Sequence, residues 1–316
     1  MRVSVCLTVL NEEGNISKLL EGLVSQSKKP NEIIVVDGGS KDKTVEIVKH
    51  FQKKSQFVKL IIEEGSISHG RNTAIELASN EMIAITDAGC VAKPDWLEKL
   101  IEPLINGDVG IVAGFYNMAD SGPLSRVIGC YLGTPPERFV TENFLPSTRS
   151  VAFRKRVWEE VGEFNEKLKG VGEDTEFFYK CVKSGVKIVR EKEARVVWEE
   201  MGEINLEDFW RKIYRYAKGD VQSKIWWHPS KQFASHNIKA MLVLLRYLSG
   251  IILLTLSTKY PSLFWLVISG FLLYLFWSIW KWRDVLGNWQ ERMWIPMVQV
   301  FSDTAVIAGF LSGTLR

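Results

Sequence analysis

The acidic segment Gly172-Glu173-Asp174-Thr175 is the first place where this sequence suggests chemistry. Apolar residues recur at helical spacing directly behind it, which predicts an amphipathic helix: Phe177, Phe178, Cys181 and Val182. Asp174 would lie at the start of that helix, where an aspartate most often acts as an N-cap for unpaired backbone amides. A carboxylate held at a helix start can instead act as a general base. The segment alone favours the cap, so the surrounding elements must decide.

Three acidic positions follow predicted strands in the first part of the chain. Asp37 ends the apolar run from Glu32, Asp87 ends the run from Met82, and the turn that contains Glu12 follows the strand from Val3. Helix-like segments alternate with these strands, which predicts an α/β fold with a parallel sheet covered on both faces. One strand-terminal aspartate is usually a turn former. Because ligands of such sheets bind beyond the carboxyl ends of the strands, three acidic ends predict a polar site there.

The composition limits the classes of function. The chain has 316 residues, enough for one large domain or two of ordinary size. Lysine and arginine number 40 against 37 acidic residues, so no overall field indicates a nucleic-acid partner. The four cysteines form no C-x-x-C pair and fit reduced, partly buried thiols better than a zinc site or a disulfide. A strand begins almost at Met1, so we expect no cleaved signal peptide.

The middle of the chain is less regular. Further strands are expected at 109–114, 151–153 and 186–189. Gly129–Pro146 has the composition of a long loop, which in a compact domain is often a lid or a binding element. From Leu206 aromatic and basic residues are mixed, as in Phe209–Tyr216 and Lys224–His228. Such segments suit the headgroup layer of a membrane, and a solvated basic face is the alternative.

Hydrophobic segments follow at residues 240–258, which include Arg246, and 261–280, which carry no charge. The second is long enough to span a bilayer, and the first can span if Arg246 snorkels or faces protein. A third segment at 294–312 contains Asp303 and can cross, re-enter or lie along the interface. Basic residues flank the pair, including Lys231 and Lys239 before it, which predicts cytoplasmic flanks.

We therefore expect three regions. Residues 1–205 would form a cytoplasmic catalytic domain, residues 206–237 amphipathic interfacial helices, and residues 238–316 membrane-associated helices. The protein would be an integral protein of the cell membrane, in contact with membrane lipids.

Acids at a sheet edge beside a membrane anchor suggest a phosphorylated, metal-bound substrate. Carboxylates hold Mg²⁺ or Mn²⁺ through one or two ligands while substrate phosphates supply others, and Asp87 is the natural metal contact. Asp37 could accept hydrogen bonds from a nucleobase or ribose, and Arg71 and Arg215 could pair with diphosphate oxygens. A separate carboxylate must take the proton of an incoming hydroxyl, and Asp174 fits that role.

Four ordered motifs resemble those of the family 2 glycosyltransferases: Val9-Leu10-Asn11-Glu12-Glu13, Val36 to Thr44, Asp87-Ala88-Gly89 and Gly172-Glu173-Asp174. The resemblance, over about residues 3–220, implies an inverting enzyme with the GT-A fold that uses a nucleotide sugar. It implies that Glu12 and Asp37 contact the nucleoside, that Asp87 meets metal and diphosphate, and that Asp174 is the base, beside Glu173. Lys212 to Tyr216 resembles a variant of the Q-x-x-R-W motif of membrane-bound synthases.

Two positions depart from that family pattern. Gly89 occupies the third position of the acidic D-x-D motif, so Asp87 is its only carboxylate. Val197-Trp198-Glu199 stands where many relatives carry a metal-binding histidine. The metal is therefore expected to depend on Asp87, diphosphate and water, or to contribute weakly.

The leading hypothesis is a membrane-anchored inverting glycosyltransferase that moves a sugar from a UDP- or GDP-sugar to a lipid-linked or growing glycan acceptor, together with other glycan-assembly proteins. A processive polysaccharide synthase uses the same chemistry but needs a translocation channel, for which two or three hydrophobic segments are few. A non-catalytic nucleotide-sugar-binding scaffold is the alternative from another class. The Glu173-Asp174 pair argues against the scaffold, because a binding module needs no base.

Overall fold

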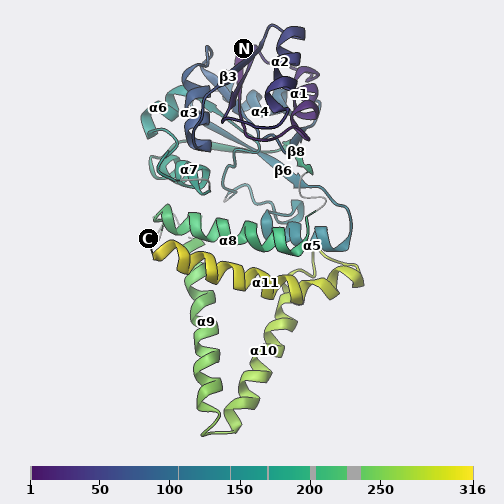
Figure 1. The fold of residues 1–316 in the computed structure, drawn as a ribbon, viewed down its shortest axis with the longest axis vertical. Helices are drawn as coiled ribbons and strands as arrows, with labels where there is room; N and C mark the ends of the chain where they lie inside the picture. The colour runs from purple at the N-terminus through teal and green to yellow at the C-terminus, as the bar shows by residue number, and fades with distance from the viewer. Residues whose placement is uncertain are drawn as a thin grey trace. The chain divides into compact units, whose positions relative to one another are not determined.

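The computed structural model describes residues 2–105, 107–142, 144–168, 171–199, 204–225 and 236–315 (Figure 1). The chain divides into two compact units. Unit 1 contains the described residues of Met1–Ala119 and Phe139–Glu200, and unit 2 those of Asp120–Arg138, Met201–His228 and Ala234–Arg316. Each unit has a hydrophobic core of its own. The boundaries of the functional domains stay a prediction.

Unit 1 is an eight-stranded sheet with helices on both faces. Its strands are β1 (Val3–Val9), β2 (Glu32–Asp37), β3 (Val58–Ile62), β4 (Met82–Ile85), β5 (Cys90–Ala92), β6 (Ile111–Met118), β7 (Val151–Arg154) and β8 (Ile188–Trp198). Its helices are α1 (Ile16–Val24), α2 (Thr44–Lys54), α3 (Ile67–Glu76), α4 (Trp96–Ile101), the 3-10 turn η1 (Glu102–Ile105), α6 (Lys155–Val161) and α7 (Glu173–Lys183).

The sheet order is β3-β2-β1-β4-β7-β6-β8-β5. Strands β1 to β4 pair in parallel, as their continuous apolar runs predict. The sheet is nevertheless mixed, because β7 is antiparallel to both β4 and β6, and β5 is antiparallel to β8. Because β7 runs opposite to both β4 and β6, and β8 is parallel to β6, the strands β4, β6 and β8 run in the same direction. All three end at one edge of the sheet, where β7 begins.

Helix α7 is held to this sheet by its apolar face. Phe177 and Phe178 are fully buried, and the ring centroids of Phe177 and Phe153 of β7 are 5.9 Å apart. The core cluster continues through Ile85 at the end of β4. The predicted amphipathic helix is confirmed, and its packing fixes the first turn of α7 at the edge where β4 ends.

Unit 2 is helical. It contains α5 (Pro123–Leu132), the 3-10 turn η2 (Pro136–Arg138), α8 (Leu206–Gln222), α9 (His236–Leu256), α10 (Ser262–Lys281) and α11 (Trp289–Thr314). Helices α9 and α10 form a hairpin, and α8 and α11 lie side by side across its open end (Figure 1). The expectation that Gly129–Pro146 is all loop is wrong, because α5 extends to Leu132 and η2 follows. Residues 226–228 and Lys231 lie outside the described residues.

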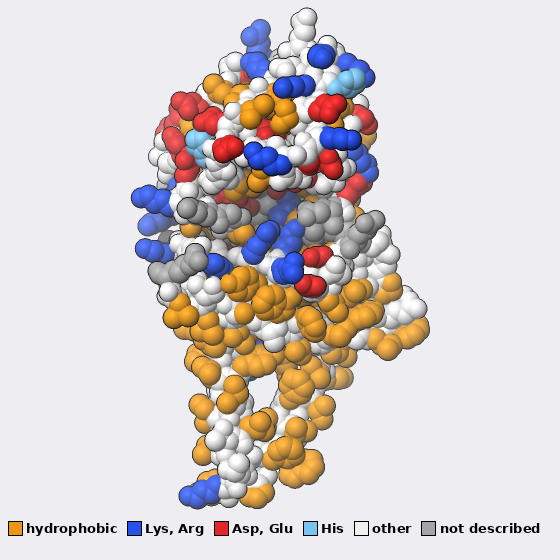
Figure 2. Space-filling model, in the orientation of Figure 1, with side chains coloured by type: hydrophobic (Ala, Val, Ile, Leu, Met, Phe, Trp, Pro, Cys, Tyr) orange, Lys and Arg blue, Asp and Glu red, His pale blue; other side chains and the backbone are white. Residues whose placement is uncertain are grey.

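The described residues contain three helical stretches that are long and apolar enough to cross a membrane: Asn237–Leu256, Ser262–Lys281 and Trp289–Thr314. Hydrophobic side chains cover the visible face of the hairpin (Figure 2). Arg246 of α9 faces protein, since it pairs with the buried Asp303 of α11 at 2.7 Å. Asp303 also accepts hydrogen bonds from the hydroxyls of Tyr247 (3.0 Å) and Tyr274 (2.6 Å). These bonds tie α11 to both helices of the hairpin.

Helix α11 packs closely along α8. A Cβ atom added to Gly309 would lie 2.3 Å from the carbonyl oxygen of Tyr214, and one added to Gly313 would lie 2.9 Å from Cβ of Val221. Small residues four apart let two helix backbones approach in this way. The hydroxyls of Tyr214 and Ser312 add a hydrogen bond of 2.9 Å. Because α8 carries charged residues along its length, the two helices form a layer distinct from the apolar hairpin.

Candidate active site

The carboxyl ends of the first parallel strands carry two interlocked turns. Asp37 is 0% exposed, and its carboxylate accepts hydrogen bonds from the amides of Gly39 (3.0 Å) and Ser40 (2.8 Å) and from the Ser40 hydroxyl (2.6 Å). Asn11, at a φ of 56°, accepts from the Lys41 amide at 2.8 Å. Asp37 therefore shapes the turn after β2, the role that a strand-terminal aspartate commonly has. Its contact with a nucleoside stays a prediction.

Glu12 lies in the first of these turns. Its amide donates to the Thr44 hydroxyl at 2.7 Å, and its carboxylate accepts from the Asn15 side chain at 2.9 Å. Glu12 and Asp37 thus follow neighbouring strands, β1 and β2, as the sequence predicted. The side chain of Glu12 is half-buried.

A buried arginine joins the other predicted residues. Arg71 of α3 is 3% exposed and forms ion pairs with Glu173 and with Asp87, the latter at 3.1 Å. It also donates to the Thr148 hydroxyl at 2.9 Å. Burial alone would lower the pKa of Arg71, but the charges of Asp87 and Glu173 outweigh burial and raise it. The guanidinium is therefore a fixed cation between the end of β4 and the start of α7.

Asp174 is not the N-cap of α7. Gly172 takes that position with a left-handed φ of 92°, and Asp174 lies inside the first turn. Its Oδ1 accepts from the Thr175 amide at 2.7 Å. Burial and the charge of neighbouring Glu173 raise the pKa of Asp174, against the opposing effects of Arg71 and Arg149. A carboxylate with a raised pKa, at the sheet edge where Asp87 and Arg71 meet, has the properties of a general base.

Sequence interpretation missed a second arginine at this edge. Arg149 lies in the turn before β7, with its guanidinium 3.7 Å from the ring centroid of Trp198 and 5.0 Å from that of Tyr116. It donates to the Ser147 hydroxyl at 3.1 Å. The only local signal is a polar turn, Ser147-Thr148-Arg149-Ser150, just ahead of a strand. The stack forms because β6 and β8 pair, which no local pattern reveals.

The acidic motif Asp87-Ala88-Gly89 offers a divalent cation one carboxylate. The carboxylate of Asp87 is 33% exposed and points its Oδ1 at Arg71. Across the described ranges, no group of three or more His, Cys, Asp or Glu side chains could hold a metal ion. This donor set fits an ion that takes most of its ligands from substrate phosphates and water, as Mg²⁺ and Mn²⁺ commonly do.

The remaining predicted residues lie elsewhere. Arg215 is on α8 of unit 2, so its contact with a diphosphate stays a prediction. The four cysteines are buried free thiols, as expected from their spacing: Cys6, Cys90, Cys130 and Cys181. Burial raises the pKa of Cys181 to about 12, so its thiol stays protonated near neutral pH.

The fold and site define the class of protein. The chain is similar to the mannosyltransferase PcManGT from Pyrobaculum calidifontis, solved with GDP-Man and Mn²⁺, at a TM-score of 0.68 and 19% identity over 99% of this chain and 87% of that one. It is also similar to S. aureus TarS 1–349 with UDP, at a TM-score of 0.53 and 17% identity over 100% of this chain and 92% of that one. These likenesses confirm the GT-A fold.

Residues 4–144 match the description "Glycosyl transferase family 2", and residues 137–281 match "Glycosyl transferase family group 2". The chain belongs to the family 2 glycosyltransferases. It is 30% identical over 178 residues to glycosyltransferase AglE of Haloferax volcanii, covering 54% of this chain and 58% of AglE. It is 27% identical over 236 residues to the probable glycosyltransferase YdaM of Bacillus subtilis, covering 69% of this chain and 55% of YdaM. The aligned regions thus span less than two thirds of these relatives.

Proposed function

We propose that the protein is an inverting glycosyltransferase that moves a sugar from a nucleotide-diphosphate donor to a hydroxyl of a lipid-linked or growing glycan acceptor. One observation carries the proposal. Asp174, with a raised pKa, lies in the first turn of a helix packed at the sheet edge where Asp87 and Arg71 meet. Family membership supports the same chemistry.

Asp174 would act as the base. It would take the proton of the acceptor hydroxyl as that oxygen forms a bond to the anomeric carbon of the sugar. The bond from the same carbon to the diphosphate would break on the opposite face, so the diphosphate leaves with the bonding electrons and the configuration inverts. Glu173 would act indirectly, by anchoring Arg71 beneath the site.

For Arg71 we propose a role different from the predicted contact with diphosphate. Its donors face Glu173, Asp87 and Thr148, so it would position the two carboxylates. Asp87 would then hold a divalent ion together with the donor diphosphate, and that ion would supply neutralisation of the leaving group. The ligands named for the two solved relatives, GDP-Man with Mn²⁺ and UDP, make GDP- and UDP-sugars the first donors to test.

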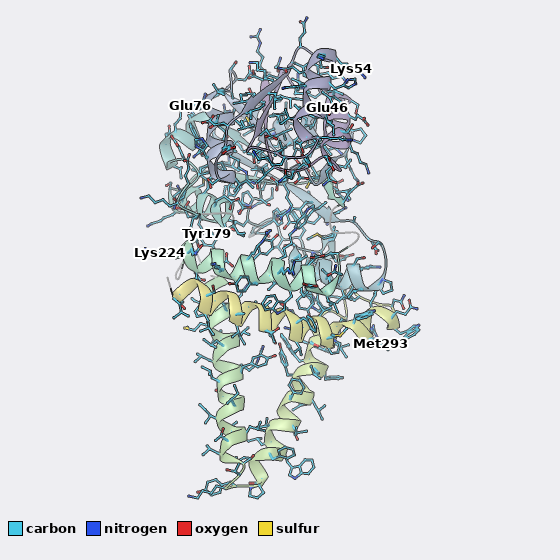
Figure 3. All side chains as sticks on the ribbon, in the orientation of Figure 1. Glu46, Lys54, Glu76, Tyr179, Lys224 and Met293 are labelled. Carbon is cyan, nitrogen blue, oxygen red and sulfur yellow. The ribbon has the colours of Figure 1, made fainter. Side chains whose placement is uncertain are left out.

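We further propose that α9 and α10 cross the membrane while α11 lies along its surface. Helix α11 packs on the charged helix α8, which cannot enter a hydrocarbon layer without severe cost. Helix α11 carries an exposed apolar stripe that begins with Trp289 and Met293. Met293 is labelled on this helix in Figure 3. Such a stripe suits the acyl boundary. Basic residues beside the hairpin, including Lys239 and Lys281, favour a cytoplasmic catalytic unit.

The test is a nucleotide-release screen of UDP- and GDP-sugars with the full chain in detergent, with and without Mn²⁺. Asp174→Asn should abolish acceptor-dependent transfer and leave nucleotide binding intact. Asp108→Asn is the matched control, because Asp108 precedes β6 at the opposite edge of the sheet, where it pairs with Lys187. Retained transfer by Asp174→Asn, or equal loss in the control, would reject the assignment of Asp174.

A further inference from the structure

The Arg149 stack, formed by Arg149, Trp198 and Tyr116, lies on one half of the sheet edge. Along the sheet order, β2 with Asp37 and β4 with Asp87 come before β7, β6 and β8. Asp37 and Asp87 thus follow strands of the first half, and the chain after Asp87 crosses to β5, where Cys90 pairs with Trp198. Arg149 precedes β7, Tyr116 lies two residues before the end of β6 and Trp198 ends β8, so the stack lies on strands of the second half. If the donor lies over the first half, the second half is where an acceptor approaches.

The Arg149 stack is connected to the surroundings of Asp174, the proposed base. Thr148 accepts from Arg71, and Arg149 is the next residue in the same turn, which closes by a backbone hydrogen bond from Ser150 to Ser147 of 3.0 Å. The register of β7 with β4 pairs Val151 with Ile85, so this turn lies beside the segment that carries Asp87. The charge of Arg149 acts on Asp174 directly. The guanidinium is thus part of the surroundings of the base.

The stack presents a cation and not a bare aromatic platform. The guanidinium lies over the Trp198 ring at 3.7 Å, and Trp198 itself is buried. A sugar ring cannot stack on a ring face that is already covered. The two rings stand nearly perpendicular to each other (81°), and together with the hydrogen bond to Ser147 they restrict the movement of the guanidinium. An arginine cation held in place is suited to pair with an oxyanion. Planar, bidentate pairing with phosphate is the interaction that such an arginine favours.

We propose that Arg149 binds a phosphate group of the acceptor, so that the acceptor is a phosphorylated molecule such as a lipid phosphate or a glycan linked to lipid through phosphate. This assignment rests on the proposed transferase function. The candidate membrane helices in the same chain favour the lipid-linked form. Arg149 would hold the phosphate while the acceptor hydroxyl faces Asp174, so it is a binding residue that selects the substrate class.

The experiment measures binding, and so does not depend on turnover. Four probes share one chain and differ only in the head group: farnesol, farnesoic acid, farnesyl phosphate and farnesyl diphosphate. Each is titrated by calorimetry into the detergent-solubilised full chain as wild type, Arg149→Gln, Arg149→Lys and Arg156→Gln. Arg156 is an exposed arginine of α6 that donates to the backbone carbonyl of Gly107 at 3.3 Å, and it serves as the matched control.

The wild type should bind the phosphate probes more tightly than farnesol or farnesoic acid. Arg149→Gln should weaken phosphate-probe binding about 10- to 100-fold, the range expected for a charge-assisted hydrogen bond. Arg149→Lys should recover part of that loss because it keeps the charge, and Arg156→Gln should match the wild type. Binding of GDP and UDP should be unchanged in every variant.

Three outcomes would overturn the proposal. In the first, Arg149→Gln binds the phosphate probes as tightly as the wild type. In the second, farnesoic acid binds the wild type as tightly as farnesyl phosphate does. In the third, Arg149→Gln weakens the binding of GDP or UDP and not that of the phosphate probes. The last result would place Arg149 on the donor. A wild type that binds the phosphate probes through Arg149 but transfers no sugar would reject the transferase function and leave the phosphate site standing.

Discussion

Replacing Arg71 with methionine is expected to destabilise unit 1 strongly. Arg71 is 3% and Glu173 is 5% exposed, so the substitution leaves the Glu173 carboxylate buried without its cation. Breaking a buried pair in this way costs about 3–5 kcal/mol. Asp87 loses a partner too, but at 33% exposure water screens most of that loss, which adds at most about 1 kcal/mol.

The assay is thermal unfolding of the full chain in detergent, monitored by tryptophan fluorescence. For a unit of about 150–250 residues each kcal/mol shifts Tm by about 2–4 °C, so Arg71→Met should lower Tm by about 6–20 °C. The control Arg156→Met alters an exposed arginine and should change stability by no more than about 0.5 kcal/mol.

The double variant Arg71→Met with Glu173→Met separates the buried charge from the loss of packing. Replacing both members of a buried pair by apolar side chains is often neutral or stabilising. The double variant should therefore regain at least half of the Tm lost in Arg71→Met. An Arg71→Met variant that melts within about 2 °C of the wild type would refute this reasoning. A double variant with a lower Tm than Arg71→Met would also refute it, because the buried pair would then not hold this part of the site together.

Three other perturbations test separate parts of the molecule. The pKa of Asp174 is raised from 3.8, so its ionised form disfavours the folded state and Asp174→Asn should raise Tm at pH 7. For the same reason, the rate of wild-type transfer should fall on the acid side at a pH above 3.8. A lower Tm for Asp174→Asn, or an acid limb at or below pH 3.8, would contradict the raised pKa. Hydrogen bonds to Glu63 and Glu166 raise the pKa of His69 from 6.5. The contribution of protonated His69 to the free energy of unfolding is therefore fully present below pH 6.5, and it is lost as the pH rises through the pKa of the folded state. The difference in unfolding free energy between wild type and His69→Gln should therefore be larger at pH 6 than at pH 9, by less than about 1 kcal/mol for this partly exposed pair, and no difference would refute the pairing. Gly309→Val should push α11 from α8, lower Tm and raise hydrogen exchange in both helices, whereas Gly287→Val, where an added Cβ meets nothing within 4 Å, should not.

Much of the fold follows from local patterns. The apolar runs that became β1, β2 and β4 end at Asn11, Asp37 and Asp87 because turn-forming and acidic residues interrupt them. The apolar residues of α7 recur at helical spacing, and the charge-free run of α10 is long enough to form its own helix. These elements depend on neighbours within a few residues, which is why sequence periodicity predicts them.

Other elements depend on distant partners. Strand β8 extends to Trp198, well past the predicted Val189, because pairing with β6 and β5 supports a stretch rich in charged residues that resembles a loop by itself. Helix α5 was missed for a similar reason, since its glycine and polar residues weaken the helical pattern that packing restores. Local propensity is a weak guide wherever tertiary contacts supply the stability.

The sequence by itself determined the class of chemistry: acids at the ends of parallel strands, a Glu173-Asp174 pair at a helix start, and a hydrophobic hairpin behind them. It could not determine which side chains meet. Only the tertiary structure made Gly172 the cap and freed Asp174 from that role, buried Arg71 between Glu173 and Asp87, and stacked Arg149 on Trp198. The contacts of Arg71 and Arg149 join residues far apart in the sequence, and their geometry is set by sheet register and helix packing, which no local pattern encodes.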